Sequence, residues 1–239
     1  MVLAEAPAAT TDFAFTAVDP FTSKGLPGAT VKSCAATDTA CASPFETLTS
    51  DADGKVTFKS LPTPGKGFDG FVQVQIDTDL PNLNFEGNPI TGNYGSGYGR
   101  TNYGDAQLAT LLQTAETKVT FDRSRGIIGL QAHDCSQFPG GISCRDKACK
   151  TYNPGGVAFS IDVQDPAIVL GYVANVDGKV GLSTKATSTS ALLGLAGFVN
   201  VPPGPVTVTA KVAATGQTIG TYEMFSRAGA LSATIALPR

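Results

Sequence analysis

A pattern of turn, short strand and turn occurs twice in this chain, in residues 50–62 and again in residues 190–202. Serine, glycine, phenylalanine and proline stand at the same offsets in both copies. A segment of alternating apolar and polar residues follows each copy, at 71–76 and at 206–212, and this alternation is typical of a half-buried β-strand. A repeat with so long a period predicts two similar β domains rather than one larger fold.

Turn signals and short strands alternate through most of the chain. Asp53-Gly54 is the strongest hairpin signal, because glycine accepts a positive φ without steric cost. A parallel α/β fold would need helices between its strands, but the sequence predicts only one, with Asp105 placed to cap it and three leucines on one face. The pattern therefore predicts an all-β fold of two tandem Greek-key β-sandwich domains with one short linking helix.

The predicted domain boundaries follow from these signals. We expect a flexible leader at residues 1–11, the first sandwich at 12–104, the helix and linker at 105–118, and the second sandwich at 119–239. Within the first domain, residues 84–104 are rich in Tyr, Gly and Asn without an apolar period, which predicts a long loop. The leader lacks the basic and apolar regions of a signal peptide, so we expect any export signal or lipid anchor to lie outside this sequence.

Charge and composition narrow the classes of function. The formal net charge is −3 and no run of lysine or arginine occurs, so the sequence predicts no nucleic-acid partner and no membrane-surface role. No apolar stretch approaches the length of a transmembrane segment. Five cysteines, only 15% charged residues and many short strands together favour a secreted or cell-surface protein.

The cysteines divide into a pair and a group of three. Cys34 and Cys41 flank a short loop between strands predicted to be neighbours, and we favour a disulfide that stabilises the fold by about 2–3 kcal/mol over two buried thiols. The other three cysteines and the single histidine form a candidate zinc set of Cys3His composition: His133, Cys135, Cys144 and Cys149. That set lacks Cys-x2-Cys spacing, so a second disulfide with one odd thiol competes with zinc, and the sequence does not decide which cysteines would pair.

The motif Asp51-Ala52-Asp53-Gly54 resembles the start of a calcium loop. It lacks the further oxygen ligands and the closing glutamate of an EF-hand. The second copy of the repeat has lost both carboxylates, which a turn tolerates more readily than an ion site does. The motif therefore favours a hairpin turn.

The Tyr/Gly-rich segment carries the candidate binding residues. It would stack on sugar rings or dock a protein partner, since tyrosine and arginine are enriched at the centres of interfaces. The candidate residues are Tyr94, Tyr98, Arg100 and Tyr103. The alternative is an inter-domain loop that covers an exposed strand edge.

The first copy of the repeat belongs to a longer series. Gly-x-Pro-Gly-Ala-x-Val stands at residues 25–31, Ser-Asp-Ala-Asp-Gly-Lys-Val at residues 50–56, and a Leu-Pro pair and an alternating strand follow. This series resembles the carboxypeptidase regulatory-like, or transthyretin-like, β-sandwich domain, and the second half carries a degenerate copy that includes residues 200–204. The shared motifs are turn and packing motifs, so the resemblance implies the fold and an accessory, spacing or adhesive role.

Two enzyme classes share this sandwich, the intradiol dioxygenases and the hydroxyisourate hydrolases. The resemblance implies that such enzymes use several histidines together with tyrosine or arginine in their active sites, whereas this chain has one histidine. No Gly-x-Ser-x-Gly motif is present, and a Cys-His pair of His133 and Cys135 competes with an incidental histidine at a strand end. We therefore expect no catalytic residues and no cofactor.

The expected function is that of a non-catalytic extracellular structural or adhesive surface protein. Its expected partners are copies of itself, in a homo-oligomer or filament, or another surface protein or a glycan. Two alternatives stay open. One is an accessory module that binds carbohydrate or protein through the Tyr-rich segment, and the other is a structural zinc protein.

Overall fold

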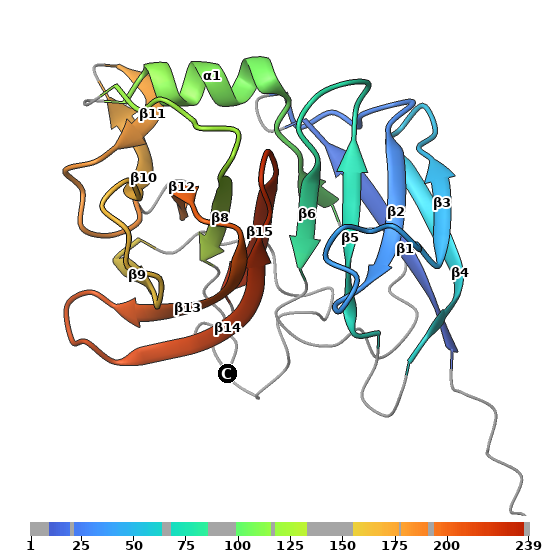
Figure 1. The fold of residues 1–239 in the computed structure, drawn as a ribbon. Helices are drawn as coiled ribbons and strands as arrows, with labels where there is room; N and C mark the ends of the chain where they lie inside the picture. Colours follow the sequence, from blue (N-terminus) through green and yellow to red (C-terminus); the bar gives the residue numbers. More distant parts are fainter. Residues whose placement is uncertain are drawn as a thin grey trace, which may run out of the picture. The chain divides into compact units, whose positions relative to one another are not determined.

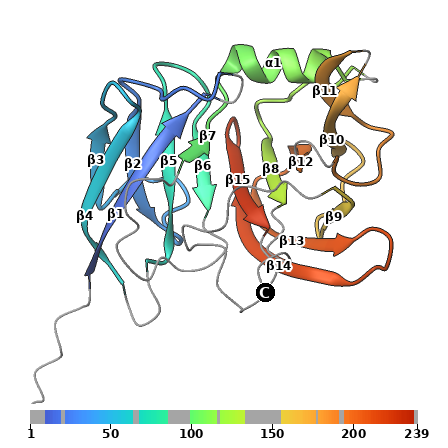
Figure 2. The ribbon, with the colours of Figure 1, turned by 180° about the vertical axis from the view of Figure 1, so that it is seen from behind.

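The computed structural model of the chain is shown in Figure 1, and Figure 2 shows it from behind. The structure describes residues 10–19, 22–63, 68–85, 99–115, 118–132, 155–176, 178–190 and 194–236. In these residues the chain forms strands β1 to β15 and one short helix, α1. The predicted all-β fold with a short helix is confirmed.

The chain divides into two compact units. The first comprises Met1–Asp79 and Asn88–Tyr103, and the second comprises Leu80–Gly87 and Gly104–Arg239. The chain therefore passes between the units three times. This division differs from the predicted boundary after residue 104, because Leu80–Gly87 groups with the second unit.

The first unit contains two groups of paired strands. One has the order β4-β1-β7, and its strands are Lys55–Pro62, Thr10–Val18 and Gly99–Thr101. β1 pairs antiparallel with β4 and parallel with β7. The other group has the order β5-β2-β3 with antiparallel pairs, and its strands are Gly70–Gln75, Thr30–Ala35 and Glu46–Thr49.

The core of the first unit receives side chains from both groups of strands. β1 alternates buried and half-buried residues, as a strand with one inward face requires, so Phe13, Phe15 and Ala17 are buried. Phe13 stacks on Phe58 of β4 with 6.3 Å between ring centroids, and Val72 of β5 belongs to the same buried cluster. Each large apolar side chain buried here contributes about 1.5–3 kcal/mol. The two groups of strands therefore form one β-sandwich.

The second unit also contains two groups of strands. The larger has the order β11-β10-β12-β8-β15-β6. In that order its strands are Lys179–Ser183, Val169–Val176, Leu195–Val201, Gly126–Ala132, Leu231–Ala236 and Asn82–Phe85. β8 pairs antiparallel with β12 and parallel with β15, and β15 also pairs parallel with β6. The smaller sheet, β14-β13-β9, contains Thr218–Ser226, Gly204–Val212 and Val157–Ile161.

A hydrogen bond in the core of the second unit joins its two sheets. Tyr172 of β10 is 2% exposed, and its hydroxyl accepts a hydrogen bond from the backbone N–H of Phe159 in β9 at 3.1 Å. The bond gives a partner to a hydroxyl that burial has removed from water. Phe198 of β12 and Val208 of β13 are buried as well. The second unit is therefore also a β-sandwich.

The two units repeat the same strand connectivity. β1 in the first unit pairs antiparallel with β4 and parallel with β7, as β8 in the second unit does with β12 and β15. In the opposite sheets, β2 pairs antiparallel with β5 as β9 does with β13. The two copies of the sequence repeat fall on β4 and β12, and Gly54 and Gly194 precede these strands with φ of 75° and 61°. The predicted tandem arrangement of two β-sandwiches is confirmed.

Helix α1 spans Asp105–Gln113 and buries the leucines predicted to share one face: Leu108, Leu111 and Leu112. The predicted capping role of Asp105 is wrong, because Gly104 occupies the N-cap position. Asp105 lies in the first turn instead, where its carboxylate accepts hydrogen bonds from the backbone N–H of Leu80, at 3.1 Å, and from the Arg123 guanidinium. A carboxylate in the first turn also interacts favourably with the helix dipole.

Short strands lie at both ends of the segment predicted to be a long loop. β6 pairs with β15, and β7 pairs with β1. Thr234 Oγ1 donates a hydrogen bond to the carbonyl of Phe85 at 3.3 Å, across a sequence separation of 149 residues. Strands of three or four residues show too little alternation to be recognised, and partners this distant leave no local signal.

Candidate functional site

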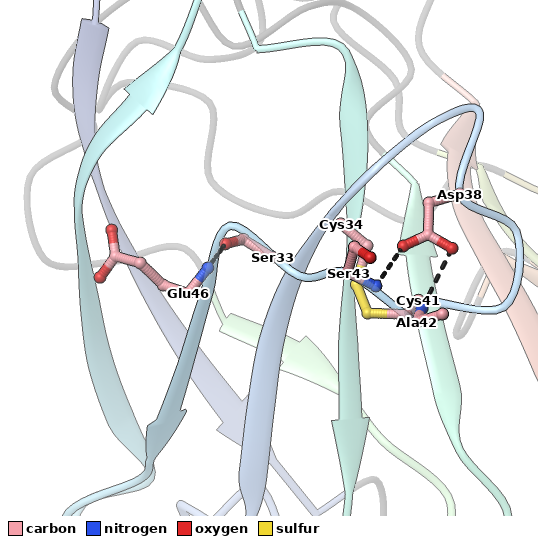
Figure 3. Close-up of a disulfide and its surroundings, with 7 residues drawn as sticks. All are labelled: Ser33, Cys34, Asp38, Cys41, Ala42, Ser43 and Glu46. Carbon is pink, nitrogen blue, oxygen red and sulfur yellow. Dashed lines mark hydrogen bonds between the residues drawn. A yellow bond between two sulfur atoms is a disulfide. The ribbon is translucent and has the colours of Figure 1, made fainter.

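Cys34 in β2 and Cys41 in the following loop form a disulfide with a Cα–Cα distance of 5.4 Å (Figure 3). Both residues are buried. Within the loop, the carboxylate of Asp38 accepts hydrogen bonds from the backbone N–H groups of Ala42 and Ser43, at 3.0 and 2.8 Å. One covalent bond and one carboxylate therefore fix the conformation of this loop.

The buried disulfide has a structural rather than a redox character. It closes a loop with a sequence separation of 7, which removes entropy from the unfolded chain and stabilises the fold by about 2–3 kcal/mol. Exchange chemistry needs an accessible sulfur, and both sulfur-bearing residues here are shielded from solvent. Structural disulfides of this kind persist in oxidising compartments outside the cytosol.

The residues of the Tyr-rich segment have different surroundings. Tyr94 and Tyr98 lie outside the described residues. Arg100 lies in β7, whose backbone pairs with β1. Tyr103 is half-buried, and burial raises the pKa of its hydroxyl to about 12. A tyrosine placed in this way offers little ring surface to a ligand, so a binding role for the segment would depend on the other three residues.

The candidate zinc set, His133, Cys135, Cys144 and Cys149, also lies outside the described residues. A Cys3His site and a second disulfide with one odd thiol therefore both stay predictions. Within the ranges that the structure does describe, no group of three His, Cys, Asp or Glu side chains is placed to hold a metal ion.

The Asp-x-Asp-Gly motif forms the turn that leads into β4. A carboxylate oxygen of Asp51 accepts hydrogen bonds from the backbone N–H groups of Asp53 and Lys55, at 2.9 and 2.8 Å. Gly54 donates its N–H to the Asp51 carbonyl at 3.0 Å. Asp53 forms an exposed ion pair with the Lys55 ammonium at 3.1 Å. The acidic residues of this motif thus stabilise a turn, as short polar side chains commonly do.

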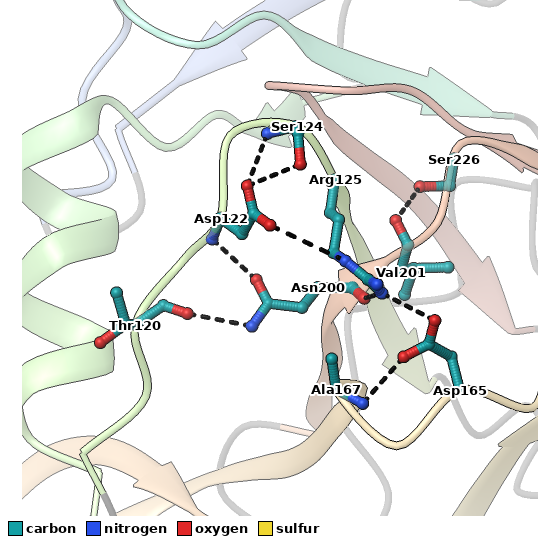
Figure 4. Close-up of polar contacts among 9 residues, drawn as sticks. All are labelled: Thr120, Asp122, Ser124, Arg125, Asp165, Ala167, Asn200, Val201 and Ser226. Carbon is teal, nitrogen blue, oxygen red and sulfur yellow. Dashed lines mark hydrogen bonds and ion pairs between the residues drawn. The ribbon is translucent and has the colours of Figure 1, made fainter.

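A network around Arg125 joins two loops and the end of β12 in the second unit (Figure 4). The Arg125 side chain is 25% exposed, and its Nη1 lies 3.0 Å from Asp165 Oδ2. The same Nη1 donates a hydrogen bond to the Asn200 carbonyl at 3.0 Å, and Nε lies 3.8 Å from Asp122 Oδ2. Asn200 Oδ1 accepts the N–H of Asp122 at 2.8 Å, and Asn200 Nδ2 donates to the Thr120 carbonyl at 3.0 Å. The network thereby fixes the start of β8 against the end of β12.

Hydrogen bonds favour the charged form of both carboxylates in this network. The hydroxyl and N–H of Ser124 lower the pKa of Asp122, with a smaller effect from the Arg125 charge. The N–H of Ala167 and then Arg125 lower the pKa of Asp165. The sequence signal for the network, an aspartate three residues before an arginine, is too common to single out, and the role that the geometry supports is structural.

Comparison with known proteins finds distant structural similarity. No family model matches the chain, and no curated protein matches it. The shaft pilin SpaA from Lactobacillus rhamnosus GG is 12% identical, with 97% of this chain and 98% of that chain covered and a TM-score of 0.27. The Bacillus anthracis TIE protein is 14% identical, with 97% of this chain and 34% of that chain covered and a TM-score of 0.27. GBS52, the minor pilin of Streptococcus agalactiae, is 12% identical, with 96% of this chain and 98% of that chain covered and a TM-score of 0.26.

The chain is thus similar, at low identity and low TM-score, to structures that include two pilins. The fold assignment above stands on the strand pairing of this chain and not on these alignments. Membership of the carboxypeptidase regulatory-like family stays a prediction. In the part of the chain that the structure describes, no helix has the length and apolar character needed to cross a membrane.

Proposed function

We propose that this protein is a non-catalytic structural or adhesive component of an extracellular surface. The observation that carries the proposal is the repetition of one sandwich connectivity in two units, as β4-β1-β7 and as β12-β8-β15. The residues that recur between the copies are glycine, phenylalanine and proline, which set turns and core packing rather than chemistry. The buried Cys34–Cys41 disulfide supports a location outside the cytosol.

The chain path between the units supports a spacing role. Tandem domains joined by one linker reorient freely by default. Here the chain passes from one unit to the other three times, after Asp79, after Gly87 and after Tyr103. After cleavage at any one of these points, the β1–β7 pairs or the β6–β15 pairs would also have to break before the units separate.

The proposal includes self-association through a strand edge. β14 is nine residues long and stands at the end of its sheet, and Thr218, Thr221 and Glu223 on it are exposed. An edge of this length presents backbone groups that can pair with another chain. Light scattering over a concentration series, with electron microscopy, should reveal oligomers or filaments. A particle that stays monomeric at the highest concentration would remove self-association from the proposal.

A charge on this edge tests whether it is the contact. Thr221→Lys places an ammonium on the exposed face of β14 and should shift assembly to higher concentration. The matched control is Thr30→Lys, an exposed threonine on β2, which lies between β3 and β5 and presents no edge. Equal assembly by both variants would exclude β14 as the contact.

A second candidate function is binding through the Tyr-rich segment. One observation favours it: β6 and β7, which flank residues 86–98, are both paired with other strands. Segments held at both ends by a scaffold are common binding elements. A glycan array should give hits that a Tyr94→Ala/Tyr98→Ala variant loses and that Tyr103→Phe retains. Hits that all variants share, or no hits at all, would remove this candidate for glycans.

The number of zinc ions and of free thiols per chain decides between the zinc site and a second disulfide. Metal analysis and thiol titration of the folded protein distinguish the two predictions for His133, Cys135, Cys144 and Cys149. One zinc per chain with three reactive thiols after metal removal supports the Cys3His site. One thiol per chain and no zinc supports a second disulfide.

A further inference from the structure

We propose that the last strand, β15, is a mechanical clamp that lets the second unit carry tension along the chain. β15 lies between β8 and β6, as both Figure 1 and Figure 2 show, and it runs parallel to both. Leu231, its first residue, pairs with Asn82 of β6 and with Ile127 of β8. The strand is thus held on two sides along the same direction.

Tension enters and leaves the second unit at two defined points. Once the first unit has unfolded, a pull on the N-terminus reaches the second unit at Leu80, just before β6. A pull on the C-terminus reaches it after Ala236, at the end of β15. Because parallel strands begin at the same edge of a sheet, the start of β6 and the end of β15 lie at opposite edges. The two pulls therefore act along these strands in opposite directions.

This direction of loading strains the strand pairs together. β15 forms four register pairs with β6 and six with β8. A pull along the strands distributes the load over these pairs, whereas a pull across the open end of an antiparallel hairpin, such as β13–β14, opens one pair at a time. Forced unfolding follows the unfolding rate, so a geometry that must break several bonds in one step resists more.

Burial protects the clamp from water. Leu83 and Ser232 are fully buried, and Thr234 is 4% exposed. Thr234 Oγ1 adds a bond to the Phe85 carbonyl beside the strand pairs, and the ring of Phe85 meets that of Phe225 edge-on at 5.0 Å. In this buried position, water cannot reach a stretched backbone hydrogen bond and take its place. An unpaired backbone N–H or carbonyl in such surroundings costs free energy.

The clamp deepens the structural role proposed above and rests on that role for its biological use. The two proposals fail separately. A monomer in light scattering would remove self-association and leave the clamp intact. A second unit that yields easily under load would remove the clamp and leave self-association intact.

The decisive experiment is single-molecule force spectroscopy on the full chain in two geometries. The first pulls between the two termini. The second pulls between the N-terminus and Ala228, which is exposed in the turn before β15, through an introduced azide-bearing residue. In the second geometry the pull reaches β15 at the edge where β6 begins, so the strand peels away pair by pair.

We expect the unfolding force of the second unit to fall about twofold in the second geometry, because the bonds then break in sequence. The unfolding force of the first unit should stay the same, and it serves as the internal standard. Equal forces for the second unit in the two geometries would overturn the clamp.

A conservative variant separates the clamp from a general loss of stability. Thr234→Val keeps the shape of the side chain and removes its hydrogen bond to Phe85. We expect a lower force between the termini and an unchanged force from Ala228. Thr221→Val, the same change on the exposed face of β14, should alter neither. A loss of equal size in both geometries would assign Thr234 a merely structural role and count against the clamp.

Discussion

The two units share a strand connectivity but are stabilised by different means. The first has an aromatic core around Phe13 and Phe58, and the Cys34–Cys41 disulfide fixes the loop after β2. The second has the charged network of Arg125 and a final strand held on both sides by parallel neighbours.

This difference distinguishes the features that the shared fold requires from those that differ between the two units. Both copies of the repeat keep the glycine that enters the strand and the phenylalanine that fills the core. The devices that fix loops are not repeated: Asp51 holds the turn in the first copy, and Ala191 stands at the same offset in the second. Connectivity depends on backbone geometry and core packing, so the loops are free to use covalent or ionic bonds.

The largest expected effect comes from the core position that the two copies share. Phe58→Ala and Phe198→Ala each remove a buried ring and should destabilise the protein by about 3–5 kcal/mol. Hydrogen exchange with mass spectrometry, resolved by unit, should show faster exchange only in the unit that carries the change. Phe45→Ala is the control, because Phe45 is 46% exposed. Equal loss of protection in both units would mean that they unfold as one body.

Removal of the disulfide should affect the first unit alone. A Cys34→Ala/Cys41→Ala variant is expected to lose about 2–3 kcal/mol, because the unfolded loop regains its entropy. Urea denaturation and exchange by unit measure the loss. Wild-type protein in reductant is the control, and a further loss of protection there in the second unit would reveal a disulfide among the remaining cysteines.

Loss of the charged network should affect the second unit alone. Arg125→Met keeps the apolar stem and removes bonds to Asp165 and to the Asn200 carbonyl, at an expected cost of about 1–2 kcal/mol. The matched control is Lys59→Met, which removes an exposed ion pair with Asp12 in the first unit and should cost less than about 1 kcal/mol. Equal costs would show that partial burial of Arg125 contributes nothing.

The smallest expected effect is a difference in acid sensitivity. Hydrogen bonds lower the pKa of Asp122, Asp162 and Asp165 in the second unit, and a bond from the Ser60 N–H lowers that of Asp12 in the first. A carboxyl group with a lowered pKa in the folded state stabilises the folded protein at pH values above its unfolded pKa of 3.8. That stabilisation is lost as the pH falls through the folded-state pKa. Exchange by unit below about pH 4 should show protection lost first in the second unit. Earlier loss in the first unit would contradict this assignment.

Sequence patterns predict those parts of the fold that have a local period. The alternation along β1 and the turns before β4 and β12 follow from side-chain direction and from glycine geometry. β6 and β7 have no such signal, since their hydrogen bonds come from β15 and β1, far away in the chain. The residue type of Asp105 suits the N-cap position and predicts it there, whereas Gly104 occupies that position in the structure.

The site residues follow the same division. Cys34 and Cys41 are close in sequence on an expected strand and loop, so their proximity could be predicted. Tyr103 stands in a polar, glycine-rich segment that suggests exposure, yet tertiary packing half-buries it. Arg125 reaches Asn200 and Asp165 only because the sandwich brings two loops and the end of β12 together.

The separation of β6 and β15 in the sequence determines how long after β6 its partner strand is synthesised. A ribosome adds about 5–20 residues per second, so β6 waits roughly 7–30 s for a partner that is 149 residues away. Of the strands that the structure describes, those of the first unit are all made once Thr101 has been added, whereas the second unit still lacks β15 until residues 231–236 emerge. A chain that stops short of that strand leaves β6 and β8 unpaired along one edge, a template for misassembly that quality control can recognise. β15 thereby completes the second unit only after the other described strands of that unit have been made.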